Sequence, residues 1–182
     1  MAIDKIQSES INLADNFAFT GTVTGAGGAF SPRFSVYLGS GNQTISNSTE
    51  TVAAFNTEVF DDGGCYNNTS GTVTLNGIST PAYSFAPNVA GTYIFGLKAA
   101  FQTDANHYSI MYLYKNSTTL VENQYYNELG NNRPHNATMI TSMNGTSDSV
   151  NMRVWQNSGS SKSLYGTELY NSHFFGYLLK AT

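Results

Sequence analysis

The sequence predicts an all-β sandwich, and three observations carry that prediction. Apolar and polar residues alternate along four stretches of the chain, residues 93–101, 108–114, 137–143 and 150–155. Alternation with a period of two is typical of half-buried strands. Clusters rich in Gly, Asn and Ser separate the stretches, as expected for short strands joined by tight turns. The best helical candidate, residues 49–56, is short and contains β-branched residues that disfavour a helix.

The clearest strand runs from residue 93 to residue 101. One of its faces is entirely apolar and is predicted to lie in the core: Tyr93, Phe95, Leu97, Ala99 and Phe101. Residues 108–114 and 150–155 have apolar character on both faces, which fits a sheet whose outer side is also partly covered, and packing between subunits would cover it. We expect the strand tyrosines, such as Tyr93, Tyr108 and Tyr112, to fill the core or a contact between subunits.

Composition limits the partners. The 182 residues suit one domain with a short extension, and their net charge is −4. Only 11% are charged, against about 25% in a typical domain. The eight Lys and Arg residues form no cluster, which argues against a nucleic-acid partner, and no window approaches the roughly 18 apolar residues of a membrane span. Cys65, the one cysteine, is interpreted as a small buried hydrophobe.

Residues 1–28 differ from the rest and are predicted to be an extended segment that anchors or oligomerises the chain. The residues predicted to anchor the chain to a particle are Ile11, Leu13, Phe17, Phe19 and Val23, and a glycine-rich hinge follows them. A lone extended segment cannot bury an apolar side. It either docks on its own head or pairs with the same segment of sister chains, and we favour pairing. No secretory signal opens the chain. Residues 29–182 are predicted to form the head.

No pattern indicates catalysis. The three histidines have no metal-ligand spacing, and no pair of carboxylates is spaced for acid–base chemistry. Asp61 and Asp62 stand beside two glycines, and we interpret them as an ordinary acidic turn, with a calcium-binding loop as the alternative. The sequence therefore predicts a protein that is not an enzyme and has no cofactor or metal site.

The landmarks of the head resemble a known family. They are Pro32-Arg33-Phe34-Ser35, Phe55, Cys65-Tyr66-Asn67, Gly91-x-Tyr93-x-Phe95, Leu113-Tyr114-Lys115-Asn116, Gly145 with Asp148 and Val150, and Phe174-Phe175-Gly176-Tyr177-Leu178-Leu179. In this order they resemble the globular head of the first complement component, a branch of the tumour-necrosis-factor-like superfamily. The resemblance implies a homotrimer of ten-stranded jelly rolls.

The same resemblance assigns framework and trimer residues: Phe55, Tyr66, Gly91, Tyr93, Phe95, His173, Phe175, Gly176 and Leu178. In the family the closing strand runs close to the trimer axis. His173 would then approach its copies and respond to pH, or it is an ordinary hydrogen-bonded histidine. Gly176 is expected to be required where another chain approaches. Phe175 departs from the family, which more often has Ser-Gly after its first Phe.

Two further groups concern recognition. Residues 1–28 resemble, less specifically, the leaders of phage fibre and decoration proteins. Tyr125, Tyr126, Arg133 and His135 are expected to lie in one connection between strands, where a binding loop would contact a receptor.

Together these features predict a non-enzymatic trimeric virion structural protein, such as a fibre, knob or capsid decoration, assembled in the host cytoplasm. Its partners would be its own copies, a capsid or tail protein, and a host surface glycan or protein. The alternative is a soluble recognition protein of the complement-head type that binds carbohydrate or protein. A third class, an enzyme with a site between subunits, has no support within one chain.

Overall fold

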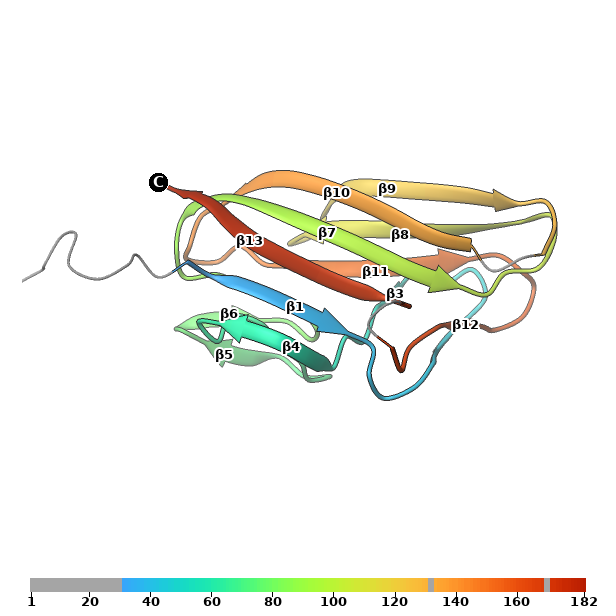
Figure 1. Cartoon of the computed structure of the whole chain (residues 1–182), viewed down its shortest axis with the longest axis horizontal. Coiled ribbons are helices and arrows are strands. Elements are labelled where there is room, and N and C mark those ends of the chain that lie inside the picture. The colour runs from blue at the N-terminus through green and yellow to red at the C-terminus, as the bar shows by residue number, and fades with distance from the viewer. Residues whose placement is uncertain (1–30, 131–132, 169–170) are drawn as a thin grey trace, which may run out of the picture. The chain divides into compact units, whose positions relative to one another are not determined.

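The computed structural model describes residues 31–130, 133–168 and 171–182, and residues 31–182 form one compact unit (Figure 1). Ile11, Leu13, Phe17, Phe19 and Val23, which are predicted to anchor the chain to a particle, lie outside the described residues. The described residues contain thirteen strands, and no helix long and apolar enough to span a membrane occurs among them. The predicted all-β class is confirmed.

Seven strands form the larger antiparallel sheet. Along the sheet they follow the order β2 (Gln43–Ile45), β12 (Lys162–Leu164), β7 (Gly91–Phe101), β13 (His173–Ala181), β1 (Arg33–Tyr37) and β4 (Thr57–Asp62), with β10 (Arg133–Met143) also paired to β7.

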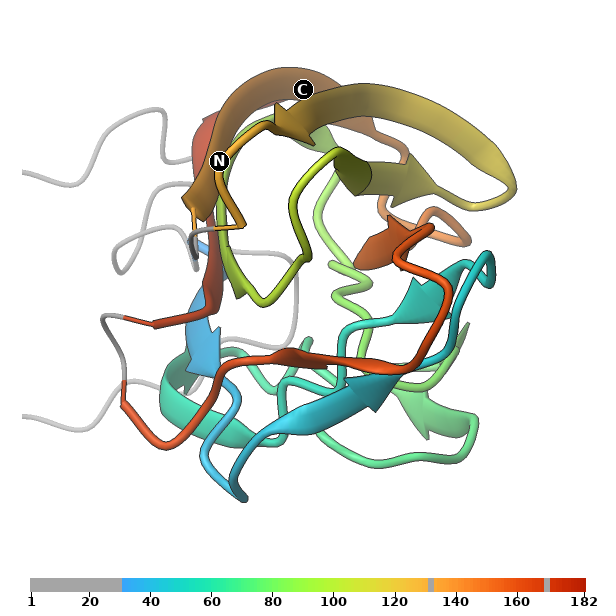
Figure 2. The ribbon, with the colours of Figure 1, turned by 90° about the vertical axis from the view of Figure 1, so that its right-hand side faces the viewer.

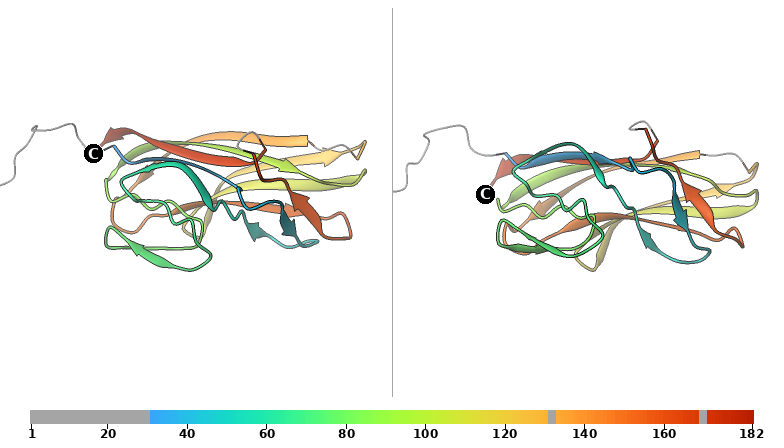
Figure 3. Two further views of the ribbon diagram at one scale, coloured as in Figure 1. Left: turned by 60° about the horizontal axis from the view of Figure 1, so that its bottom comes forward. Right: turned by 90° about the horizontal axis from the view of Figure 1, so that it is seen from below.

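Four strands form the second sheet, in the order β3 (Thr51–Val52), β11 (Val150–Gln156), β8 (His107–Lys115) and β9 (Thr118–Asn127). The chain passes from β7 to the β8–β9 hairpin of this sheet and returns to β10, which lies beside β7. Figures 2 and 3 show the two sheets as separate layers. This crossing between layers is typical of a sandwich with Greek-key connections.

A short hairpin, β5 (Val73–Leu75) and β6 (Ile78–Thr80), stands apart from both sheets. Asn76 and Gly77 form its two-residue turn, and both have positive φ, 50° and 81°. Asn-Gly is the pair that a type I′ turn favours, because both central residues must adopt this conformation. The Asn76-Gly77 pair therefore accounts for the turn of this hairpin.

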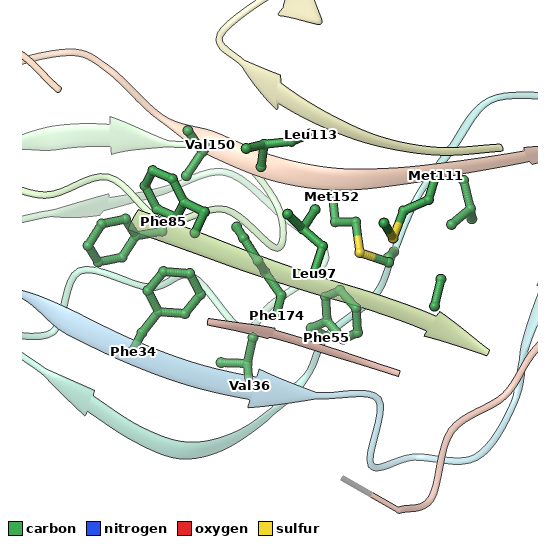
Figure 4. Packing of buried hydrophobic residues seen from close by; sticks show 14 of the residues in the cluster. Phe34, Val36, Phe55, Phe85, Leu97, Met111, Leu113, Val150, Met152 and Phe174 are labelled. Carbon is green, nitrogen blue, oxygen red and sulfur yellow. The ribbon is translucent and has the colours of Figure 1, made fainter. Parts of the chain in front are cut away.

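Phenylalanines dominate the core between the sheets (Figure 4). The Phe34 ring stacks on Phe85 with centroids 4.4 Å apart and meets Phe174 edge-on at 4.8 Å. The second sheet contributes Met111 and Met152, both fully buried. Aromatic pairs of this kind add about 0.5–1.5 kcal/mol each beyond the area that they bury.

The apolar face of β7 is in the core as predicted, since all five of its members are at most 3% exposed. Of the strand tyrosines, only Tyr93 fills the core. Tyr108, which is 38% exposed, and Tyr112, which is half-buried on the same outer side of β8, do not lie in the core. A contact between subunits, the other position expected for them, stays a prediction. Met111 and Leu113, of the opposite parity, take the core positions instead. The described residues contain thirteen strands rather than the ten expected, because the short strands β2, β3 and β12 extend the two sheets and β5 and β6 form a separate hairpin.

One polar network explains why Lys115, Asn116 and Asp148 are landmarks of the sequence. The Lys115 ammonium pairs with the Asp148 carboxylate at 2.8 Å, and the Asn116 side chain donates to the same carboxylate at 2.9 Å. Burial raises the pKa of Asp148, but these two contacts and the Asn144 backbone N–H outweigh it, and the net pKa is lowered. The network fixes the β8–β9 turn against the loop that precedes β11.

Candidate functional site

The candidate site is the outer side of the seven-stranded sheet, which we call the seven-strand face. The residues that share it across β1, β13, β7 and β10 are Arg33, Ser35, Tyr37, His173, Phe175, Tyr177, Ile94, Gly96, Lys98, Thr138 and Ile140. Their neighbours of opposite parity, such as Phe34, Phe95 and Phe174, are fully buried in the core. Since side chains alternate along a strand, the face points away from the core.

The middle of the seven-strand face is an aromatic row on β13. Phe175 is paired in register with Gly96 on β7, and a Cβ atom on Gly96 would overlap the Phe175 ring. The glycine therefore leaves the space that the ring occupies on the sheet. Along β13 the His173 ring stacks on Phe175 at 6.0 Å, and Tyr177 meets it edge-on at 5.7 Å.

Charged groups stand at the β4 edge of the face. Phe60 extends the aromatic row, with its ring 6.1 Å from Tyr177. The Arg33 guanidinium lies 5.6 Å from the Phe60 centroid and pairs with Asp62. Both partners of that ion pair are about half exposed, 53% and 45%, so it contributes little to stability.

Aliphatic side chains are exposed on three strands of this sheet. Ile140 on β10 is 54% exposed, Leu179 on β13 is 53% exposed, and Val59 on β4 is 51% exposed. Ile140 lies opposite Ile94 in the β10–β7 register. An apolar surface shared by several strands indicates an interaction site.

Most of the predicted framework residues belong to the core. Phe55, Tyr66, Tyr93 and Phe95 are at most 3% exposed, and Leu178 packs partly against them. The Tyr66 hydroxyl donates to the Phe55 carbonyl at 3.2 Å, and the Tyr93 hydroxyl donates to the Val89 carbonyl at 2.8 Å. Each buried hydroxyl therefore has a partner.

Three other framework residues lie on β7 and β13. Gly91 faces the Lys180 carbonyl. His173 and Phe175 lie on the seven-strand face.

Gly176 was expected to be required where another chain approaches, but the structure gives a different reason for the glycine. A Cβ atom there would come within 2.6 Å of both the Phe34 and the Phe95 rings. These rings belong to the same chain and lie inside the sandwich. The crowding that requires glycine is therefore packing within the head, and no second chain is needed to explain it.

The expected binding loop does not exist as predicted. Tyr125 and Tyr126 lie within β9, and Arg133 and His135 lie within β10. Hydrogen bonding across the sheets extends both strands into the segment that the sequence suggested was a connection. His135 is 3% exposed and is not available to a receptor, whereas Tyr126 is 40% exposed. The receptor-contact role of the tyrosines remains a prediction.

His135 connects the two sheets through a polar cluster that the sequence did not reveal. Its Nε2 lies 2.8 Å from Ser109 Oγ on β8, and its Nδ1 lies 2.9 Å from Asn123 Oδ1 on β9. Because an amide oxygen only accepts, Nδ1 carries the proton and Nε2 accepts from the serine. Burial lowers the pKa of His135. A serine beside a histidine that is held by a third group has the connectivity of a hydrolytic triad.

This cluster is closed to substrates. Ser109 is 2% exposed, so no carbonyl can approach its hydroxyl. The arrangement instead satisfies polar groups that would otherwise be buried without partners.

The carboxylate of Asp61, one of the two aspartates of the acidic turn, is hydrogen-bonded to the backbone that follows it. The Asp61 carboxylate accepts the backbone N–H groups of Cys65 at 3.1 Å and Tyr66 at 2.9 Å. Burial raises the pKa of Asp61 despite these hydrogen bonds. Cys65 is fully buried in the core, as predicted. Within residues 31–130, 133–168 and 171–182, no three His, Cys, Asp or Glu side chains gather as metal ligands.

Comparisons with solved structures identify the fold. Murine APRIL at pH 5.0 is similar with a TM-score of 0.55 and 7% identity, over 82% of this chain and 99% of that one. The globular domain of zebrafish complement 1qA has a TM-score of 0.51 and 16% identity, over 83% and 99%. The head has the complement-1q/TNF-like jelly-roll fold. The resemblance drawn from the sequence is confirmed at the level of the fold.

A third similar structure is a vertex protein. The PRD1 vertex protein P5 is similar to this jelly roll with a TM-score of 0.53 and 10% identity, over 85% of this chain and 100% of that one. No protein-family model and no curated protein matches the sequence. The similarity is therefore one of fold, carried by strand arrangement rather than by sequence.

Proposed function

We propose that the chain is a non-enzymatic virion structural protein that forms a homotrimer through the seven-strand face. The observation that carries the proposal is the aromatic row of β13 beside the half-exposed Ile140 and Leu179. Removing an apolar surface from water is favourable, by a free energy of roughly 25 cal/mol per Å² of surface buried. Closed symmetry allows identical copies to cover it on every subunit.

The virion assignment rests on two supports. The jelly roll is similar to the PRD1 vertex protein P5 over that protein's whole length. Residues 1–28 carry the apolar residues Ile11, Leu13, Phe17, Phe19 and Val23 ahead of a glycine-rich hinge and would anchor the head to a capsid or tail protein. The head would then point outward, toward a host surface glycan or protein.

The non-enzymatic part of the proposal rests on the surroundings of the chemically capable groups. Ser109 and His135 are buried, and Asp148 is held by Lys115. A serine-directed fluorophosphonate should leave the folded chain unlabelled at Ser109. Stoichiometric labelling of that residue would contradict the proposal.

The alternative is a recognition protein of the complement-head type. The likeness to the zebrafish complement 1qA domain favours it, with the highest sequence identity of the three structures, 16%. Both candidates use the same fold and trimer, so only the particle distinguishes them.

The test has two arms. In the first, analytical ultracentrifugation of the full chain should give a trimer at micromolar concentration, and a stable monomer would exclude the proposed assembly. In the second, a chain lacking residues 1–28 should remain a folded trimer yet be absent from purified particles. Normal incorporation of that truncated chain would remove the virion anchor from the proposal, whereas absence of the full chain from purified particles would favour the alternative.

A further inference from the structure

The outer side of the four-stranded sheet is a second aromatic surface, which we call the four-strand face. It is formed by Asn157, Trp155 and Arg153 on and after β11, Tyr108, Ile110, Tyr112 and Tyr114 on β8, and Glu122, Gln124 and Tyr126 on β9. On the same strands Met111, Leu113 and Met152 fill the core. The alternating direction of strand side chains therefore places the face outward.

One end of the four-strand face is charged and internally paired. The Arg153 guanidinium lies over the Tyr114 ring at 4.1 Å and pairs with Glu50 at 2.8 Å. The Tyr114 hydroxyl donates to the same Glu50 carboxylate at 2.8 Å. Burial, followed by the nearby Glu122 and Glu50 carboxylates, raises the pKa of Tyr112 to about 12. These groups satisfy one another and leave little for a ligand.

The other end of the face has no formal charge. Tyr108 and Tyr126 are direct cross-strand partners, with ring centroids 4.8 Å apart at an angle of 50°. They are 38% and 40% exposed. The next row of the sheet holds Gln124, Ile110 and Trp155. Neither row contains a carboxylate, an ammonium or a guanidinium group.

Amide groups border the two exposed rings. The Tyr126 hydroxyl donates to Asn106 Oδ1 at 3.3 Å, and Asn157 Oδ1 accepts the Tyr108 backbone N–H at 2.7 Å. Gln124 is exposed beside them. We call Tyr108, Tyr126, Trp155, Gln124 and the two asparagines the neutral end.

We propose that the neutral end of the four-strand face binds an uncharged carbohydrate chain. Aromatic rings offer flat apolar area for the C–H faces of a sugar, while tyrosine hydroxyls and amides offer donors and acceptors for its hydroxyls. The absence of formal charge from the two rows matches a neutral ligand, since an ionic one would lose its hydration without gaining a counter-charge. The inference rests on the proposed outward-facing head and gives the class of ligand that such a head would contact.

The chain carries its own reporter for this test. Trp155 is the single tryptophan and lies in the second row of the neutral end. The full chain would be titrated with neutral oligosaccharides of glucose, galactose, mannose and N-acetylglucosamine, and with uronic-acid and sialylated oligosaccharides for comparison. A saturable change in tryptophan fluorescence with a neutral sugar is expected. Saturation only with acidic sugars, or with none, would overturn the proposal.

Variants then localise the binding. Tyr108→Ala and Tyr126→Ala should each weaken the sugar about tenfold or more, because each removes a stacking surface, and tenfold corresponds to about 1.4 kcal/mol. Tyr83→Ala, which removes a half-buried tyrosine outside both sheets, is the matched control and should leave the affinity unchanged. Melting curves would establish that the variants are folded, and Gln124→Ala, at an exposed position, provides a second test that does not disturb the rings.

The results of the sugar titration, the oligomeric state and the particle incorporation together distinguish failure of this inference from failure of the proposed function. If Tyr108→Ala changes the oligomeric state instead of sugar binding, the face is a contact between copies, and the carbohydrate proposal is wrong. If no sugar binds while the trimer and the particle anchor are found, the carbohydrate site alone fails. If the chain binds sugar but never enters a particle, the carbohydrate site is supported and the virion assignment is wrong.

Discussion

The two outer faces of this sandwich are both aromatic, yet they differ in what surrounds the rings. On the seven-strand face Phe175 packs over Gly96, and the half-exposed Ile140 lies on the neighbouring strand. On the four-strand face the rings are tyrosines whose hydroxyls reach Glu50 and Asn106. An aliphatic and phenyl surface favours permanent cover by another protein surface, whereas rings with polar edges tolerate water and suit reversible binding. This difference is the basis on which we propose assembly through one sheet and recognition through the other.

The largest expected effect is a loss of stability when Gly176, which packs against core rings beneath the seven-strand face, is enlarged. Gly176→Leu should destabilise the head by about 3 kcal/mol or more, because the new side chain would enter the space of the Phe34 and Phe95 rings. Chemical denaturation would measure the loss. Gly71→Leu is the matched control, since a Cβ there meets nothing within 4 Å. Equal stability of the two variants would show that this strand is not packed as described.

The second prediction separates the two faces directly. Ile140→Glu should weaken trimer association at least tenfold, because a carboxylate would be buried in an apolar contact. Tyr126→Glu, a similar change at an exposed position of the four-strand face, should leave the trimer intact. Sedimentation at several concentrations would compare them. Equal effects of both substitutions would remove the distinction between the faces.

The third prediction concerns the cluster that connects the sheets. The pKa of His135 is lowered by burial from its usual 6.5. The unfolded chain therefore binds a proton at a higher pH than the folded chain does, and stability should fall as the pH drops below about 6.5. Thermal melts between pH 7.5 and pH 5 would measure the trend. His135→Gln should flatten it, and an unchanged slope in that variant would assign the effect to other groups.

The smallest effect belongs to the charged end of the four-strand face. Arg153→Ala should reduce stability by roughly 0.5–1 kcal/mol, because it removes a partly exposed ion pair and a cation–π contact. The loss should shrink in high salt, since the Arg153–Glu50 pair is partly open to water. Sugar binding at the neutral end should persist in this variant. A cost of several kcal/mol would mean that the two ends of the face are coupled.

Local patterns predicted only part of this architecture. The alternation of apolar residues along residues 93–101 located β7 and identified the face of it that lies in the core. By contrast, β9 was missed, because its residues Thr118 to Gln124 are mostly polar and form a strand only by pairing with β8. The turn-like residues near Pro134 suggested a loop, yet pairing with β7 extends β10 through them.

The candidate surfaces were less predictable than the strands. The sequence nominated Phe175 and His173 through a resemblance, but it gave no sign that Gly96 leaves the space for the Phe175 ring. It nominated His135 as a contact residue, although the histidine lies between the sheets with Ser109 and Asn123. Those three residues come from three different strands, so no short motif joins them.

By itself the sequence determined the all-β class, the position of the central strand and the chemical character of the chain, which is poor in charge and rich in tyrosine and amides. These follow from side-chain period and composition, which act locally along the chain. Only the tertiary structure decided which aromatic residues lie in the core and which lie on each outer face. That choice depends on the register between distant strands, because moving a strand by one residue exchanges its buried and exposed sides.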